Sequence, residues 1–250
     1  MSSPTRTHGT RTIRVLLLMV VAGLCGCRTS TTYNADGVRQ FQRGEYQAAM
    51  DKFQQAIAVN PNDADAYYNL AATLHDWGRR SRDTKLLEQS ESLYHRCLDI
   101  SENHVDCYRA LAVLLVDTDR RDSAFKLLEL WAQRSPNLSQ PRVELARLHE
   151  EYGNDESARQ YLAQALDANS ADSRAWAAMG RLREREGRLA QALTDYQHAY
   201  DLNRYHPGVP ARIAALQQRM ARVPAGPSVN GGGTGTRMTQ NSTKWVPATR

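Results

Sequence analysis

A chain of 250 residues, 41% of them hydrophobic and 24% charged, is long enough to bury a sizeable core and has the composition of a folded, soluble body. Its net charge of +5 comes from the two ends: the residues before Cys27 and those after Val223 each carry three cations and no acid, which leaves the segment between them at −1. Because nucleic-acid-binding domains carry their excess of Lys and Arg on the folded body, we expect no nucleic acid among the partners.

The N-terminal segment predicts export. Residues 1–14 are polar and positively charged, and residues 15–24 form a continuous apolar run. This run is too short to span a bilayer as a helix, which needs about 20 residues. A positive start, a short apolar middle and small residues at the end are typical of a secretory signal peptide, which we place at residues 1–26. An ordinary cleaved signal and an uncleaved anchor stay open as alternatives.

The end of this segment, Leu24-Cys25-Gly26-Cys27, resembles the lipobox of bacterial lipoproteins. The lipobox needs a small residue before the cleavage point and a thiol that accepts a diacylglycerol, and only Cys27 follows a small residue. The resemblance implies that Cys27 is lipidated, with palmitate among the acyl chains, and that Cys25 is removed with the signal. Several acyl chains would hold the protein firmly on a membrane.

The residues next to Cys27 indicate where the protein sits. In the lipoproteins that it resembles, an Asp after the lipidated Cys often signals retention in the inner membrane; Arg28 stands here and favours the outer membrane. We therefore expect localisation in the cell envelope, facing the periplasm. Residues 27–32 form the predicted tether, and its five residues after Cys27 reach at most about 17 Å.

From residue 30 onward the sequence can be aligned with itself in successive frames: 30–63, 64–104, 105–138, 139–172 and 173–206. Small and large apolar residues alternate at helical spacing in each frame. The best-matching positions are Gly37, Ala49, Phe53 and Ala56 in the first frame and Trp176, Gly180, Ala192, Tyr196 and Ala199 in the last. This pattern resembles the tetratricopeptide repeat, whose period is 34 residues.

The resemblance implies an all-α fold, a right-handed α-solenoid of about five helix pairs over residues 33–206. Each repeat leaves an apolar face bare, so the repeats must stack, and the first helices line a concave wall. Residues 207–223 follow as an amphipathic helix predicted to cap the last repeat. Residues 224–250 are rich in Gly, Ser, Thr, Asn and Pro, which predicts a disordered tail.

Two departures from the repeat pattern carry expectations of their own. The second frame has seven extra residues, around positions 79–85, which we place in a solvated loop between its helices. The third frame has Trp131 where the family has Ala, and the fourth has Arg142 where it has an aromatic residue. A guanidinium stacked on the indole would account for both exchanges.

Four potential metal ligands lie close together: His95, Cys97, His104 and Cys107. His95 and Cys97 diverge on a helix because they are two residues apart, so at most the other three converge. Both cysteines also occupy positions where other repeats have Ala, and Cys is a small core residue. Simple packing, a disulfide between Cys97 and Cys107 in an oxidising compartment, and a metal site remain as three alternatives.

The sequence carries no pattern of an enzyme. No phosphate-binding loop, no G-x-S-x-G and no H-E-x-x-H occurs. We therefore expect no catalytic residue, no cofactor and no metal. The alternative from another functional class is a redox- or metal-responsive envelope protein that uses Cys97 and Cys107.

The resemblance implies binding of a protein or peptide on the concave wall. The residues that we single out there are Tyr68, Arg109, Val113, Arg147 and Arg181. The arginines predict pairing with a partner's carboxylates, because a guanidinium can bind a carboxylate through two hydrogen bonds. The family's clamp for a terminal carboxylate is absent, since its places hold Asn34, Val38, Asn69, Asp106 and Ala110. We expect a membrane-anchored scaffold or adaptor in the assembly of an envelope structure such as a pilus or a secretin.

Overall fold

The structure is a computed structural model, and it describes residues 29–222. This part of the chain is all-α and forms eleven helices without a strand, which confirms the predicted α-solenoid. The helices are α2 (Ser30–Gln42), α3 (Tyr46–Val59), α4 (Ala64–Ser81), α5 (Thr84–Ile100), α6 (Val105–Asp117), α7 (Arg121–Arg134), α8 (Gln140–Glu151), α9 (Asp155–Ala168), α10 (Ser173–Arg185), α11 (Leu189–Leu202) and α12 (Val209–Ala221). The predicted signal peptide, Cys27 and the predicted tail from residue 224 lie outside the described residues.

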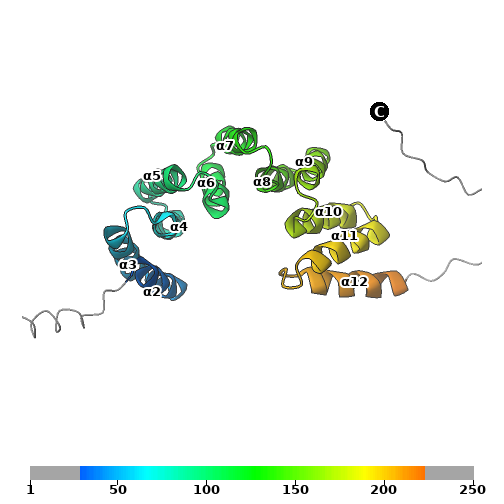
Figure 1. The fold of residues 1–250 in the computed structure, drawn as a ribbon, viewed down its shortest axis with the longest axis horizontal. Helices are drawn as coiled ribbons and strands as arrows, with labels where there is room; N and C mark the ends of the chain where they lie inside the picture. The colour runs from blue at the N-terminus through cyan, green and yellow to red at the C-terminus, as the bar shows by residue number, and fades with distance from the viewer. Residues whose placement is uncertain (1–28, 223–250) are drawn as a thin grey trace, which may run out of the picture.

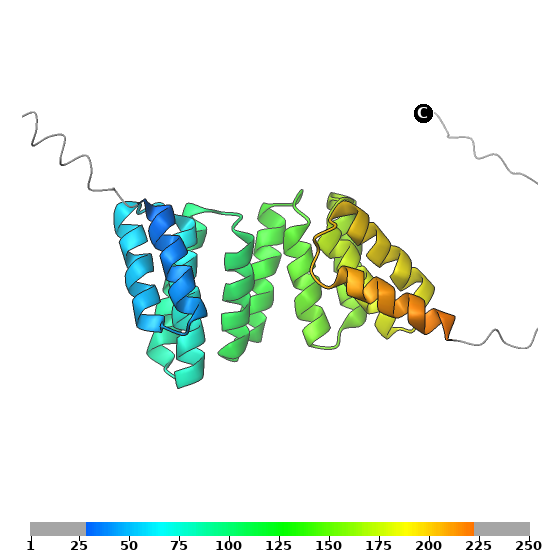
Figure 2. The same ribbon diagram turned by 90° about the horizontal axis from the view of Figure 1, so that it is seen from below.

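The helices stack into an arch. Helices α4, α6, α8 and α10 line its inside, and α3, α5, α7 and α9 form its outside (Figure 1). Turned by 90°, neighbouring helices run in alternating directions and lie side by side along the long axis (Figure 2). Each of the five sequence frames holds one helix pair. Consecutive pairs pack mainly through the second helix of one pair and the first helix of the next, with further contacts between successive inner helices.

Small residues let the two helices of a pair approach closely. A Cβ added to Gly37 on α2 would lie 2.5 Å from the ring of Phe53 on α3, and one added to Gly180 on α10 would lie 3.1 Å from the ring of Tyr196 on α11. Both rings are buried. The alternation of small and large residues is therefore the physical cause of the pairing, because the large ring occupies the space that the missing side chain leaves.

Helix α2 begins at Ser30, where the first sequence frame begins, and so takes up the last three residues of the predicted tether. The Thr29 side chain accepts a hydrogen bond from the Thr32 N–H and caps the helix. The Ser30 hydroxyl donates to Asp63, which itself caps α4 by accepting the Ala66 N–H. These capping contacts stabilise the start of α2, which the pattern of apolar residues alone does not predict to be helical.

The extra residues of the second frame do not form the expected loop. They extend both helices, so α4 has 18 residues and α5 has 17. Only a tight turn separates them: Arg82 adopts a left-handed conformation with φ of 59°, and the Asp83 side chain caps α5 by accepting the Lys85 N–H. No Pro interrupts this segment, Gly78 is buried inside α4, and Asp76 pairs with both Arg79 and Arg80 on the same helix.

Trp131 does not stack on a guanidinium. Its indole lies parallel to the ring of Tyr108 with the centroids 4.0 Å apart, and its N–H donates to Asn103 at 2.9 Å. Arg142 instead donates to the backbone carbonyls of Pro136 and Leu138. The expected stack fails because the indole points back into its own repeat, where α6 supplies an aromatic face.

Helix α12 packs on α11 and covers the last repeat with Leu216 and Val209, both buried. Within residues 29–222, no helix combines the length and the apolar character needed to cross a bilayer.

Candidate functional site

The predicted partner-binding residues lie on successive inner helices. Tyr68 is on α4, Arg109 and Val113 are on α6, Arg147 is on α8 and Arg181 is on α10. The first helix of each repeat lines the inside of the arch (Figure 1), so the five residues belong to one continuous wall. In the structure, Tyr68 lies in a groove, Val113 lies outside that groove, and the three arginines form ion pairs within the chain.

Two adjoining cavities lie on the inner surface of the first two repeats. One, of about 370 Å³, is lined by the N-terminal parts of α2 and α4 and the start of α6. The other, of about 270 Å³, is lined further along α2 and α4. Val38, Tyr68 and Asn69 line both cavities, so the two form one depression, which we call the inner groove.

Tyr68 lies in the middle of the inner groove. Its ring centroid is 5.2 Å from that of His104 and 6.2 Å from that of Tyr94. Burial raises the pKa of Tyr68, so its hydroxyl is a neutral donor and acceptor at pH 7. Val113 is half-buried on α6 and is not among the side chains that line the groove.

Polar side chains join the three helices at the N-terminal part of the groove. The Asn69 amide donates to Asn34, and the Asn34 amide donates to Asp63 at 3.2 Å. The His104 Nδ1 accepts the Cys107 N–H and so caps α6, while its Nε2 donates to Asp65 at 3.0 Å. Asp65 and His104 are not among the residues that the sequence assigned to this surface. The signal for both is their position at the start of an inner helix.

The arginines in the middle of the wall are paired within the chain. Glu144 on α8 is 2% exposed and accepts from Arg109 Nε at 3.0 Å and from Arg147 Nε at 3.2 Å. Arg109 also binds Asp106, and Arg147 also binds Glu151. These contacts form a ladder in which three carboxylates pair with two guanidiniums. A partner's carboxylate would have to compete with Glu144.

The arginines on α10 are also paired with carboxylates of the same chain. Arg181 and Arg185 both bind Glu150, whose side chain is 9% exposed, and Arg185 also binds Asp155. That these guanidiniums receive a partner's acidic residues stays a prediction, and a partner's carboxylate would have to compete with Glu150 and Asp155. Their carboxylates come from the neighbouring repeat, 30 to 35 residues away in the sequence.

The two cysteines are buried free thiols. The Cys107 thiol donates to the Tyr94 carbonyl at 3.2 Å, and its interaction with Cys97, together with burial, raises the Cys107 pKa. The same interaction lowers the pKa of Cys97 to about 6. In the described part of the chain, no group of three or more His, Cys, Asp or Glu side chains is arranged to hold a metal ion.

We expect Cys97 and Cys107 to behave as two inert thiols. Neither has any exposed surface, so a thiol reagent reaches them only after unfolding. The measurement is thiol titration of a Cys25→Ser/Cys27→Ser variant, native and denatured, with and without reductant. Two thiols should react in denaturant whether or not reductant was present; thiols that appear only after reduction would instead show a disulfide.

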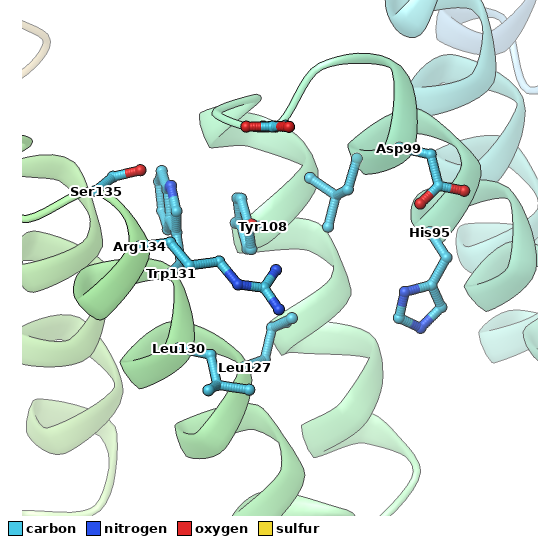
Figure 3. Close-up of a pocket in the computed structure, with 10 residues that line it drawn as sticks. His95, Asp99, Tyr108, Leu127, Leu130, Trp131, Arg134 and Ser135 are labelled. Atoms are coloured by element: carbon cyan, nitrogen blue, oxygen red, sulfur yellow. The ribbon is translucent and has the colours of Figure 1, made fainter.

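A further cavity, of about 650 Å³, opens on the outside of the arch between α5 and α7. His95 and Asp99 of α5 line one side, and Leu127, Leu130, Trp131 and Arg134 of α7 line the other (Figure 3). Its rim carries both acidic and basic side chains, so its charge favours neither an acidic nor a basic partner. It lies outside the concave wall and provides a matched comparison surface for the groove.

Comparisons with known proteins identify the repeats. Models described as "TPR repeat" and "Tetratricopeptide repeat" match residues 37–78, 122–182 and 173–206. A search of the curated proteins gives no match.

Solved structures share the architecture. A thermophilic TPR protein of Thermus thermophilus is 21% identical, with a TM-score of 0.55 over 76% of this chain and 100% of that one. A tetratricopeptide repeat protein of Parabacteroides merdae is 13% identical, with a TM-score of 0.56 over 82% and 78%. PilF of Pseudomonas aeruginosa is 18% identical, with a TM-score of 0.48 over 79% and 92%. At these identities the first two structures, with TM-scores above 0.5, establish the fold alone.

Proposed function

The chain is a tetratricopeptide repeat protein, and from this premise we propose that it binds an extended segment of a partner protein in the inner groove, as a scaffold held on a membrane. Proteins built from these repeats generally act as protein-binding scaffolds and not as enzymes. The groove, the membrane anchor and the cellular role are particular to this proposal.

The observation that carries the proposal is the continuity of the two cavities across α2, α4 and α6. An extended segment needs a binding surface longer than one side chain. The inner groove provides one, because its apolar part and its polar part adjoin along α2 and α4. The apolar part exposes half-buried side chains, Val38, Phe41 and Ala72, in a depression whose base is the buried ring of Phe53. Partly exposed apolar side chains in a concave surface are the usual anchor points of a bound peptide.

Site-specific photo-crosslinking in the native envelope tests the groove. We expect a photoreactive phenylalanine at position 68 or 42, both in the inner groove, to capture one discrete partner. The matched controls are position 130, in the outer cavity, and position 167, an exposed aspartate on α9. Capture of the partner from position 130 and not from position 68 would overturn the proposal.

The membrane anchor is supported by the sequence and by where α2 begins. Cys27 follows the apolar run of the signal, and only Arg28 and Thr29 separate it from the first residue of α2. A lipid on Cys27 would thus keep the first residue of α2 within about 10 Å of the anchored residue, because three steps of an extended chain reach at most about that distance. We propose that the scaffold serves in the assembly of an envelope structure, such as a pilus or a secretin, on the periplasmic side of the outer membrane.

Loss of the anchor should move the protein into solution. With Cys27→Ala, we expect the protein to leave the membrane fraction almost completely and to stop incorporating labelled palmitate, because no helix within residues 29–222 can hold it in a bilayer. The control is Cys25→Ala, which keeps Gly26 before Cys27 and should leave lipidation intact. Palmitate labelling that survives Cys27→Ala would contradict the assignment.

A second candidate function rests on the cysteines. Cys97 and Cys107 lie next to each other and the pKa of Cys97 is lowered, which favours a redox role, but both thiols are fully buried, which opposes it. Titration of the two thiols with and without reductant separates the two functions, since a redox role requires a bridge that forms and breaks in the folded protein.

A further inference from the structure

The inner groove has an apolar part that is formed by α2 and α4. Val38, Phe41 and Ala72 leave a cavity of about 270 Å³ there, large enough for one apolar side chain. No cation lines this part: the remaining lining residues are Gln42, Phe53, Tyr68, Asn69 and Thr73. The burial of an apolar side chain is therefore the interaction that this part offers.

The other part of the groove carries negative charge. Asp63, Asp65 and Asp106 line it together with the amides of Asn34 and Asn69. The side chains of Asp65 and Asp106 are 75% and 59% exposed, so their oxygens are accessible from the groove. Each carboxylate can accept about four hydrogen bonds, and the contacts that each makes within the chain leave acceptor sites open.

The positive groups nearby do not cancel this charge. Arg109 binds Glu144 through Nε and Nη2, and only its Nη1 reaches Asp106. His104 accepts the Cys107 N–H at Nδ1 and donates to Asp65 through Nε2. Its hydrogen bond with Cys97 raises its pKa to about 9, so it supplies at most one positive charge against three carboxylates. The polar part therefore keeps an excess of carboxylates over cations.

The spacing of the two parts matches an extended chain. The polar part spans 31–38 on α2 and 65–69 on α4, and the apolar part spans 38–42 and 68–73. Their midpoints are therefore about four to six residues apart along the helices, or about 5 to 8 Å. Side chains at positions i and i+2 of an extended segment are about 7 Å apart and point the same way.

We propose that the segment bound in the inner groove carries an apolar side chain and, two residues away, a lysine or arginine. This inference rests on the proposed function and names the chemistry of the partner. The apolar side chain enters the cavity of Val38, Phe41 and Ala72, and the cation lies among Asp63, Asp65 and Asp106. The resulting preference is opposite to the acidic partner that the arginines suggested from sequence.

Selection from a random heptapeptide phage library on the immobilised full chain tests the inference. We expect enriched peptides to pair Leu, Ile, Met or Phe with Lys or Arg two positions away. In the Asp65→Asn/Asp106→Asn variant the enrichment of basic residues should fall at least tenfold. Asp167→Asn, which removes an exposed carboxylate on α9, should leave the enrichment unchanged. Asp63 is left unchanged because it caps α4, and circular dichroism confirms the fold of each variant.

Three outcomes would overturn the inference: enrichment of Asp or Glu, equal enrichment of basic residues on the Asp65→Asn/Asp106→Asn variant, or no enriched sequence. If acidic peptides are enriched and compete with the partner captured from position 68, the inference fails while the proposed function stands. If basic peptides are enriched but capture occurs from position 130 alone, the proposed function fails.

Discussion

Replacing Trp131 with alanine should lower the free energy of unfolding by about 3–5 kcal/mol, the range for removing a buried aromatic side chain. The indole is 1% exposed, lies against the ring of Tyr108 and binds Asn103. Trp131 also lines the outer cavity, so removing the indole enlarges a space that is already there. The measurement is urea unfolding followed by far-ultraviolet circular dichroism.

Two further variants separate packing from hydrogen bonding at this site. Trp131→Phe keeps an aromatic ring beside Tyr108 but loses the indole N–H, so we expect a smaller loss. Trp176→Ala removes a tryptophan that is only half-buried on α10 and serves as the matched control. A loss below about 1 kcal/mol for Trp131→Ala would mean that the repeat repacks, and the structural role given to this residue would be wrong.

The second large effect should come from Glu144. We expect Glu144→Ala to lower the free energy of unfolding by about 3 kcal/mol, at the low end for a broken buried ion pair. The loss is limited because Arg109 and Arg147 keep 37% and 27% of their side-chain surface in contact with water. Glu156→Ala is the control: Glu156 pairs with Arg159 but is 69% exposed, and its removal should cost less than about 1 kcal/mol.

Glu144 should also decide the charge preference of the wall. In Glu144→Gln the side chain keeps its shape, but Arg109 and Arg147 lose the buried carboxylate that they share and keep only the more exposed Asp106 and Glu151. The same phage selection should then enrich Asp or Glu, which the unchanged protein does not select. An unaltered preference would show that the ladder of Asp106, Arg109, Glu144, Arg147 and Glu151 does not set the polarity of the surface.

Part of the candidate site could be predicted from sequence, because repeat registration assigns residues to the inner helices. That registration placed Tyr68 on the wall, and the structure puts it at the centre of the inner groove. It did not identify Asp65 or His104 as groove residues, since both lie at the start of a helix, where the pattern of small and large residues is silent. It also did not show that the arginines of the wall are paired with carboxylates of the same chain.

The sequence by itself determined the fold. A small residue facing a large one, as in Gly37 with Phe53 and Gly180 with Tyr196, recurs at the repeat period, and the stacking of helix pairs follows from those local contacts. Only the tertiary structure decided the charge of the wall. Arg109 meets Glu144 35 residues away, and Arg181 meets Glu150 31 residues away, because of how successive inner helices are rotated and shifted against one another. Whether an arginine reaches a glutamate on the next inner helix depends on shifts of a few ångströms in helix position. The periodicity of the sequence does not encode such shifts.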